Sequence, residues 1–299
     1  MDSVLASIES PADLRSLGPG QLTELAEEIR ERLVDVVSKT GGHLAPNLGV
    51  VELTIGLHRA LECPKDRIVW DVGHQAYVHK LLTGRHDRFD TLRTYGGLCG
   101  FPKRSESPFD SFDTGHASNS ISVALGMACA RDLAGGDETI VAVIGDGSLT
   151  GGMAFEALNH AGHLGTRLLV ILNDNEMSIS ANVGGLARYL AKVRLDPRYN
   201  RLRNDVENAI ARIPGVGEAL VAAGEAAKES FKQLLVPGML FEELGFKYVG
   251  PIDGHDVVAV QDAVGWAKDS EGPVIVHAVT RKGAGYSHAE ESPDAFHGI

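Results

Sequence analysis

The sequence has few cysteines, no excess of positive charge and no long apolar run. Its three cysteines, Cys63, Cys99 and Cys129, lie far apart without a CxxC pair, which indicates a reducing compartment. The formal net charge of −12 argues against the basic face that nucleic acids and anionic membranes require. No apolar run approaches the roughly 18 residues of a membrane-spanning helix, and residues 1–10 lack the basic segment of a signal peptide. We therefore expect a cytoplasmic protein without a nucleic-acid or membrane partner.

Glycine, in contrast, is abundant. The 299 residues include 35 glycines, which cluster where apolar runs end and so indicate tight turns beside a ligand. The hydrophobic fraction of 43% and the charged fraction of 23% are typical of a globular protein. The length suits one large α/β domain or two domains of ordinary size.

The order of the apolar runs predicts an α/β fold, a doubly wound parallel sheet with helices on both faces. Thr139–Ile144 and Arg167–Leu172 are continuous aliphatic runs, typical of strands buried on both faces. A helix over 150–161 between them completes a unit with the size of a parallel βαβ crossover. Similar patterns predict helices over 20–38, 50–61, 120–133 and 257–268, and strands over 67–71, 246–249 and 273–279.

Two segments lack these patterns. Residues 84–114 are rich in glycine, proline, serine and charge, which predicts a long loop, and long loops in compact domains are usually functional or disordered. Residues 186–235 are charged and helix-prone without a strand signal. We expect them to form helical excursions over the surface of a domain that spans residues 1–299.

The sharpest signal is Gly145-Asp146-Gly147-Ser148, between a predicted strand and a predicted helix. Ligands of open parallel sheets bind beyond the carboxyl ends of the strands, and the N–H groups of a following helix suit phosphate oxygens. A carboxylate beside a phosphate is repulsive unless a cation lies between them, so Asp146 implies a metal ion. Asn175 follows the next strand. A carboxylate, an amide oxygen, a backbone carbonyl, two phosphate oxygens and a water form the oxygen shell that Mg²⁺ prefers.

Other nucleotide sites fit the glycine-rich turn less well. Gly145, Gly147 and Gly151 give the spacing GxGxxxG rather than the GxGxxG of a dinucleotide site, and an in-turn aspartate would face the pyrophosphate without a metal. No GKS or GKT follows a glycine loop, which excludes a Walker A site. A lone GDG turn is common, but its combination with Asn173-Asp174-Asn175 after the next strand is far more specific.

This pair of motifs resembles the thiamine-diphosphate signature of the transketolase-like enzymes. Matches between about residues 13 and 297 narrow the resemblance to the 1-deoxy-D-xylulose-5-phosphate synthase family, above all in segments 41–44, 71–80, 105–107, 115–118, 151–155, 173–180 and 250–255. The resemblance implies that thiamine diphosphate and Mg²⁺ are the cofactors. It also implies that pyruvate and D-glyceraldehyde 3-phosphate are condensed to 1-deoxy-D-xylulose 5-phosphate and CO₂, with the thiazolium as the electron sink.

The resemblance assigns roles to individual positions. The Mg²⁺ ligands are the side chains of Asp146 and Asn175 and the main-chain carbonyl of Met177. The residues that line thiamine diphosphate are His74, Gly115, His116, Ala117, Gly147, Ser148, Asn175 and Tyr286. The candidate catalytic residues are His43, His74 and His116.

A histidine cluster also makes chemical sense without the resemblance, because ketol transfer moves protons near neutral pH, where imidazole titrates. A single histidine is more often structural, as His160 and His163 illustrate near the end of a predicted helix. Arg281 and Lys282 are candidate cations for an anionic ligand, although an exposed pair of this kind is commonly surface. His297 matches a mobile segment of the family.

In the family, a glutamate that contacts the pyrimidine of the cofactor belongs to a second domain, and a third domain follows it. Both lie beyond residue 299 in the usual architecture. We therefore expect this chain to supply the diphosphate and Mg²⁺ half of the site and to be inactive or weakly active alone. Its expected partner is a second copy, a second polypeptide with the pyrimidine-binding domain, or both. The alternatives are half of a split transketolase, a non-catalytic cofactor-binding subunit, and a dehydrogenase module that binds NAD without metal.

Overall fold

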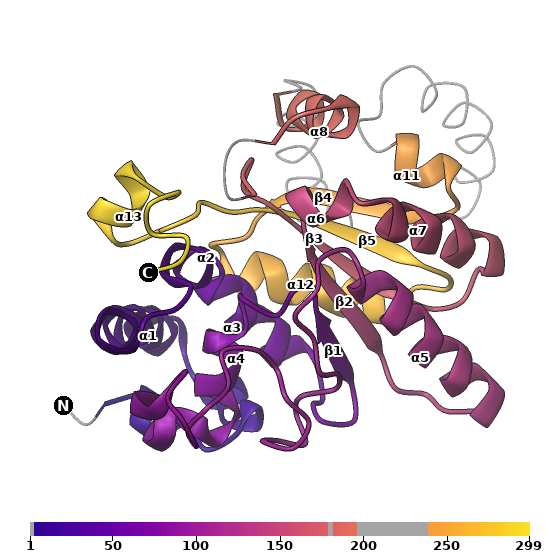
Figure 1. Cartoon of the computed structure of the whole chain (residues 1–299). Coiled ribbons are helices and arrows are strands. Elements are labelled where there is room, and N and C mark those ends of the chain that lie inside the picture. The colour runs from indigo at the N-terminus through magenta and orange to yellow at the C-terminus, as the bar shows by residue number, and fades with distance from the viewer. Residues whose placement is uncertain (1–2, 179–181, 196–238) are drawn as a thin grey trace, which may run out of the picture.

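A parallel β-sheet forms the centre of the computed structural model, which describes residues 3–178, 182–195 and 239–299 (Figure 1). Each neighbouring pair of strands is parallel. The sheet contains five strands in the order β1 (Arg67–Trp70), β2 (Ile140–Gly145), β3 (Leu169–Asp174), β5 (Val274–Val279) and β4 (Lys247–Asp253). The predicted parallel sheet is therefore confirmed, and all of its carboxyl ends lie at one edge.

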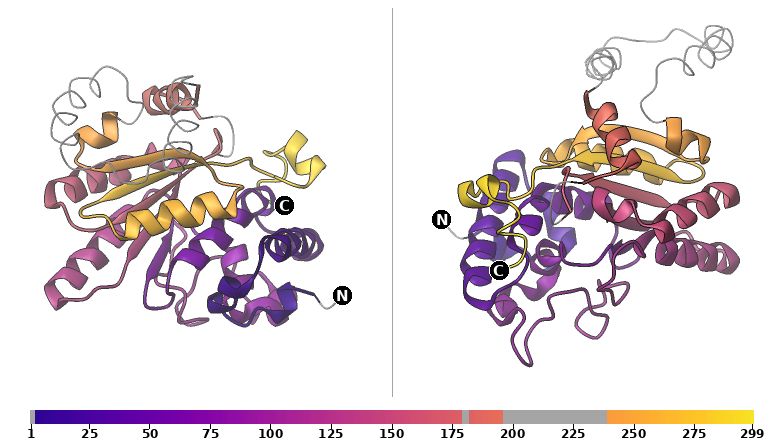
Figure 2. Two further views of the ribbon diagram at one scale, coloured as in Figure 1. Left: turned by 180° about the vertical axis from the view of Figure 1, so that it is seen from behind. Right: turned by 45° about the horizontal axis from the view of Figure 1, so that its top comes forward.

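Helices cover both faces of this sheet, as the continuous apolar runs predict (Figure 2). Along β2, Ile140, Ala142 and Ile144 face the layer formed by α5 (Ser120–Ala134) and α7 (Gly152–Leu164). Val141 and Val143 face the opposite layer, formed by α3 (Val51–Ala60) and α12 (Val257–Lys268). Because successive side chains of a strand point to opposite faces, a run without polar residues must be covered twice.

A further helical layer packs outside α3. It consists mainly of α1 (Pro19–Thr40), α2 (Leu44–Leu48) and α4 (Tyr77–Lys80), together with the short turns η1 (Leu5–Ser7), η2 (Pro11–Ser16), η3 (Leu81–Arg85) and η4 (His86–Thr91). The apolar side of α1 is buried in this layer, as its helical spacing predicts. Gly41 ends α1 with a φ of +76°, and the next residue, Gly42, exchanges backbone hydrogen bonds of 2.7 and 2.9 Å with Ile299.

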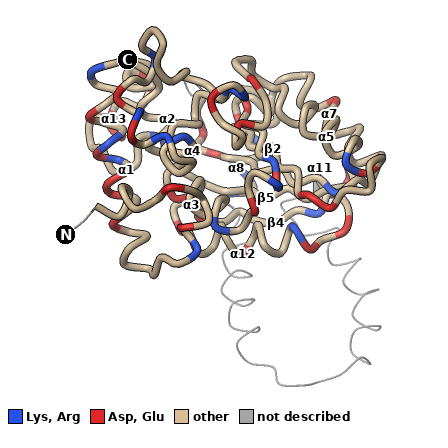
Figure 3. Tube along the Cα trace, turned by 90° about the horizontal axis from the view of Figure 1, so that it is seen from below, with Lys and Arg blue, Asp and Glu red and all other residues tan. Residues whose placement is uncertain are grey.

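The remaining helices are α6 (Asp146–Leu149), α8 (Gly185–Leu195), α11 (Met239–Glu243) and α13 (Ser287–Glu291). The short α6 separates β2 from α7, so the predicted helix does not follow the strand directly. α8 confirms the first part of the predicted helical excursion, and the rest of it lies outside the described residues. The predicted loop 84–114 is partly wrong, because residues 84–91 belong to the short helical turns η3 and η4. Segment 92–114 runs without a helix or strand, as predicted. Within the described residues no helix is long and apolar enough to span a bilayer. Acidic and basic residues are interspersed along the helices and strands (Figure 3).

Candidate active site

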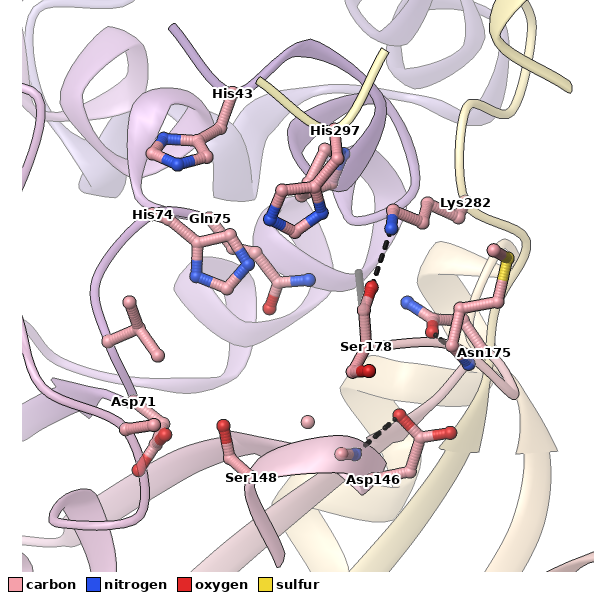
Figure 4. A pocket seen from close by; sticks show the side chains of 16 residues that line it. His43, Asp71, His74, Gln75, Asp146, Ser148, Asn175, Ser178, Lys282 and His297 are labelled. Atoms are coloured by element: carbon pink, nitrogen blue, oxygen red, sulfur yellow. Dashed lines mark hydrogen bonds between the residues drawn. The ribbon is translucent and has the colours of Figure 1, made fainter. Parts of the chain in front are cut away.

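Side chains that follow four different strands meet in one pocket. Asp71 follows β1, Asp146 follows β2, Asn175 follows β3, and Lys282 lies three residues beyond the end of β5. All four residues line a cavity of about 250 Å³, shown in Figure 4. The parallel topology brings them together because the carboxyl ends of the strands share one edge of the sheet.

The turn after β2 approaches the neighbouring loop closely. A Cβ atom at Gly147 would lie 2.8 Å from the Cβ atom of Ser178, so a larger residue would displace the loop that follows β3. The backbone N–H of Gly147 donates a hydrogen bond of 2.9 Å to Oδ1 of Asp146. Gly147 and Ser148 both line the pocket, as predicted.

Asp146 is a buried carboxylate next to a second one. Burial and the nearby carboxylate of Asp174 raise the pKa of Asp146 to about 8. Burial alone would raise the pKa of Asp174 too, but a hydrogen bond of 2.9 Å from His277 and the charge of Arg194 lower it. Asp174 therefore holds the negative charge of the pair, and Asp146 needs an added cation to ionise fully at neutral pH.

The donor set around Asp146 suits Mg²⁺. Gly145 pairs with Asn173 across β2 and β3, which places Asp146 and Asn175 beside each other where the strands end. Met177 lines the same pocket, and its N–H donates a hydrogen bond of 3.1 Å to Oδ1 of Asn175. Among the described residues no group of three or more histidine, cysteine, aspartate or glutamate side chains could hold a metal ion. One carboxylate, one amide and one carbonyl leave positions open for phosphate oxygens and water, as Mg²⁺ sites commonly do.

Three histidines stand on the opposite wall of the pocket from Asp146 (Figure 4). The ring centroids of His43 and His74 are 5.3 Å apart, and each ring lies 5.6 Å from that of His297. The Nδ1 atoms of all three are buried and without a hydrogen-bond partner among the described residues. Buried polar atoms are rarely left unpaired, so these atoms indicate a place for a ligand or water.

The histidines are held neutral. Burial lowers the pKa of His74 to about 3, and the neighbouring His43 and His297 contribute to the shift. Burial and the charge of Lys282 lower the pKa of His297 to about 4, and burial and Arg93 lower that of His43. Neutral imidazoles both donate and accept hydrogen bonds, so this wall is suited to hydroxyl and carbonyl groups.

Of the two adjacent cations Arg281 and Lys282, it is Lys282 that lines the pocket. Its side chain is buried, and Nζ donates a hydrogen bond of 2.7 Å to the carbonyl oxygen of Ser178. Burial lowers the pKa of Lys282. The side chain of Arg281 is exposed and forms an ion pair with Glu290. An ammonium group therefore faces the same space as Asp146 and the histidines.

Some predicted site residues lie away from this cavity. Gly115 and His116 are exposed, and within this segment only Ala117 lines the cavity. Tyr286 contacts the rings of His288 and Phe296 and packs against the outer helical layer. The roles assigned to these residues by resemblance remain predictions.

Asp71, Gln75 and Asp174 contribute to the site without having been predicted. Asp71 accepts hydrogen bonds of 2.9 and 3.0 Å from the N–H groups of Ser118 and Ser120, which fixes the start of α5 beside the pocket. The position of Asp71 at the end of an apolar strand, like that of Asp146, is a sequence signal that could have identified it.

Comparisons with known proteins agree with this geometry. The family model described as 1-deoxy-D-xylulose-5-phosphate synthase matches residues 5–280. The chain is 60% identical over 299 residues to the 1-deoxy-D-xylulose-5-phosphate synthase of Carboxydothermus hydrogenoformans, covering 100% of this chain and 48% of the relative. It is also 60% identical to that of Pelotomaculum thermopropionicum, covering 100% and 47%. The chain thus spans about half the length of the curated relatives it matches.

Solved structures show the same fold at lower identity. A transketolase from Leishmania mexicana matches with a TM-score of 0.66 and 22% identity, covering 93% of this chain and 39% of that one. A transketolase from Campylobacter jejuni matches with a TM-score of 0.66 and 23% identity, covering 95% and 41%. The arrangement of strands around the pocket is therefore that of the transketolase-like fold. Together with the family model and the close relatives, these findings show that the chain belongs to the 1-deoxy-D-xylulose-5-phosphate synthase family.

Proposed function

We propose that residues 1–299 form the domain of a 1-deoxy-D-xylulose-5-phosphate synthase that binds Mg²⁺ and the diphosphate of thiamine diphosphate. The observation that carries this proposal is the juxtaposition of Asp146 and Asn175 at the ends of neighbouring strands, facing a cavity that also contains a buried lysine. A carboxylate and an ammonium group in one small cavity suit a metal ion and an anion that bind together.

Each of these groups has a defined task. Asp146, Asn175 and the main-chain carbonyl of Met177 would hold Mg²⁺, and the metal ion would supply positive charge for the diphosphate. Lys282 adds a positive charge from the end of β5 and offsets the negative charge of the ligand. When bound, thiamine diphosphate supplies an electron sink for breaking and forming the bonds to the carbonyl carbon of the substrate.

The histidines would bind oxygen atoms of the substrates. His43, His74 and His297 are neutral, so their unpaired Nδ1 atoms are available to exchange hydrogen bonds with hydroxyl and carbonyl oxygens. Such hydrogen bonds would orient the substrates, because a pKa of about 3 for His74 and of about 4 for His297 makes these two rings weak bases near neutral pH. The ring of Phe101 packs edge-on against that of His43, at 6.0 Å between ring centroids.

The proposed substrates are pyruvate and D-glyceraldehyde 3-phosphate, and the product would feed isoprenoid, thiamine and pyridoxal synthesis. The 60% identity to curated synthases, against 22–23% to transketolases, favours this reaction over ketol transfer between sugars. Assays of the full-length protein with pyruvate or with a ketose phosphate as donor distinguish the synthase reaction from ketol transfer.

Three free cysteines support a cytoplasmic location. We further propose that the chain works in an assembly, as a homodimer or with a pyrimidine-binding domain.

Calorimetric titration with thiamine diphosphate, with and without Mg²⁺, tests the binding function directly. We expect Mg²⁺-dependent binding to the wild-type chain and its loss in Asp146→Ala, because the neighbouring carboxylate of Asp174 is already paired with His277 and Arg194. Asp87→Ala is the matched control, since the side chain of Asp87 is 86% exposed and lies on η4. Unchanged affinity in Asp146→Ala, or binding that is independent of Mg²⁺, would contradict the proposed function.

A further inference from the structure

Residues 281–284, which include the pocket residue Lys282, pack against the outer helical layer. The N–H of Gly283 donates a hydrogen bond of 2.9 Å to the carbonyl oxygen of Ala45 in α2. A Cβ atom at Gly49 would lie 2.9 Å from the carbonyl oxygen of Arg281 and 3.2 Å from Cα of Lys282. The backbone around Lys282 therefore lies directly against α2.

His255, in the loop between β4 and α12, binds the backbone one residue before Lys282. Its Nε2 atom accepts a hydrogen bond of 2.8 Å from the N–H of Arg281. A peptide N–H only donates, so Nε2 must be unprotonated and the ring proton of the neutral imidazole must lie on Nδ1. That Nδ1–H donates to Oε2 of Glu52, at 3.0 Å. The two contacts fix one tautomer and one orientation of the ring.

Glu52 joins this contact to a second one, farther along the same segment. It forms an ion pair of 2.7 Å with Arg30 of α1, and Nε of Arg30 donates a hydrogen bond of 2.9 Å to the carbonyl oxygen of Ala284. The set Arg30, Glu52 and His255 thus binds the backbone on both sides of Lys282. Burial alone would raise the pKa of Glu52, but the contacts with His255 and Arg30 lower it, so the carboxylate stays ionised.

We propose that His255 is a positioning residue, held by Glu52 as the Nδ1–H tautomer, which fixes the Arg281 peptide and thereby keeps the Lys282 ammonium in the pocket. His255 itself is not among the residues that line the pocket. The identity of the anion that meets Lys282 rests on the proposed function. The position of the lysine does not.

Two substitutions separate the two nitrogen atoms of His255. In His255→Gln the side-chain amide reaches the place of Nε2 and its oxygen can accept the N–H of Arg281. In His255→Asn the shorter amide reaches only the place of Nδ1 and contacts Glu52 alone. The probe is acetylation of lysines by acetic anhydride, followed by mass spectrometry of the folded full chain. Lys80 is the internal control, because its side chain is fully buried and paired with Glu106.

We expect His255→Asn to raise the acetylation rate of Lys282 several-fold, and His255→Gln to stay near the wild-type rate, with Lys80 protected in all three proteins. Equal rates at Lys282 in wild type and His255→Asn would overturn the proposal. An equal rise of the Lys282 acetylation rate in both variants would also overturn the proposal, because the position of Lys282 would then not depend on an acceptor at the place of Nε2. A parallel rise at Lys80 would show general loosening of the fold and would likewise contradict a positioning role.

Calorimetry of the same proteins with Mg²⁺ and thiamine diphosphate links the position to binding. We expect His255→Asn to weaken the affinity for thiamine diphosphate by about tenfold, because the displaced Lys282 would lose one charge-assisted contact with the ligand. We expect His255→Gln to preserve the affinity. If the wild-type chain does not bind thiamine diphosphate, the proposed function fails, and the labelling rates still decide whether His255 positions Lys282. Exposure of Lys282 without loss of affinity in a wild type that does bind would contradict the link to the ligand.

Discussion

Replacing Asp110 by asparagine tests the buried ion cluster of Asp110, His79 and Arg85, which we infer to anchor loop 92–114. Oδ1 of Asp110 accepts hydrogen bonds from Nε2 of His79 and from Arg85, both at 2.9 Å. Oδ2 accepts from Arg85 at 2.7 Å and from the N–H of Lys103 at 2.8 Å. Every neighbour of either oxygen is a donor, so the NH₂ group of an asparagine would face donors in both orientations. The contacts with His79 and Arg85 also hold the pKa of Asp110 below its usual range, despite burial.

The expected cost of Asp110→Asn is about 3–5 kcal/mol, because the substitution leaves the buried Arg85 guanidinium without its main partner. Unfolding in urea, followed by circular dichroism, measures the change. Asp137→Asn is the matched control, because Asp137 pairs with Lys65 on the surface and its loss should leave the midpoint unchanged. Equal midpoints for Asp110→Asn and wild type would refute the inference that this cluster anchors loop 92–114.

Three further predictions follow from the packing and the charges of the site. Gly162→Ala should lower the urea midpoint because its Cβ atom would overlap the carbonyl oxygen of Leu244, whereas Gly126→Ala, in open space on a helix, should raise stability by about 0.5–1 kcal/mol. Burial lowers the pKa of His74 from the usual 6.5 of a histidine to about 3, so the unfolded chain takes up the proton first as the pH falls. Between pH 7 and pH 5 the wild type should therefore lose about 2 kcal/mol more stability than His74→Asn, and equal losses would contradict burial of a neutral ring. Lys282→Gln should weaken Mg²⁺-dependent binding of thiamine diphosphate in calorimetry, while leaving the urea midpoint near that of wild type.

The sheet and the centre of the pocket were predictable because short-range patterns determine them. β2 and the first four residues of β3 contain no polar residue on either face, which requires strands covered on both sides. Once the two strands are parallel neighbours, the residues after each one must meet at the same edge. The adjacency of Asp146 and Asn175 follows from topology alone, before any side-chain position is known.

The rest of the site depends on contacts between distant parts of the chain. Arg281 and Lys282 are equivalent cations in the sequence, and it takes the packing of their backbone against α2 and the contact with His255 to place Lys282 in the pocket. His297 reaches His43 because residues 42 and 299 pair, and no local periodicity reveals that pairing. His116 shares the glycine-histidine pattern of His43 and His74, yet it is exposed, and the contact between this segment and Asp71 is made by the N–H of Ser118.

Anomalous diffraction from Mn²⁺ tests the central claim most directly. Crystals of the chain grown with thiamine diphosphate and Mn²⁺ in place of Mg²⁺ should show their strongest anomalous peak about 2.1 Å from the carboxylate of Asp146 and the amide oxygen of Asn175. The diphosphate should lie between that peak and Lys282. A cofactor bound in the crystal with its diphosphate elsewhere, or a peak away from the ends of β2 and β3, would contradict the proposed site.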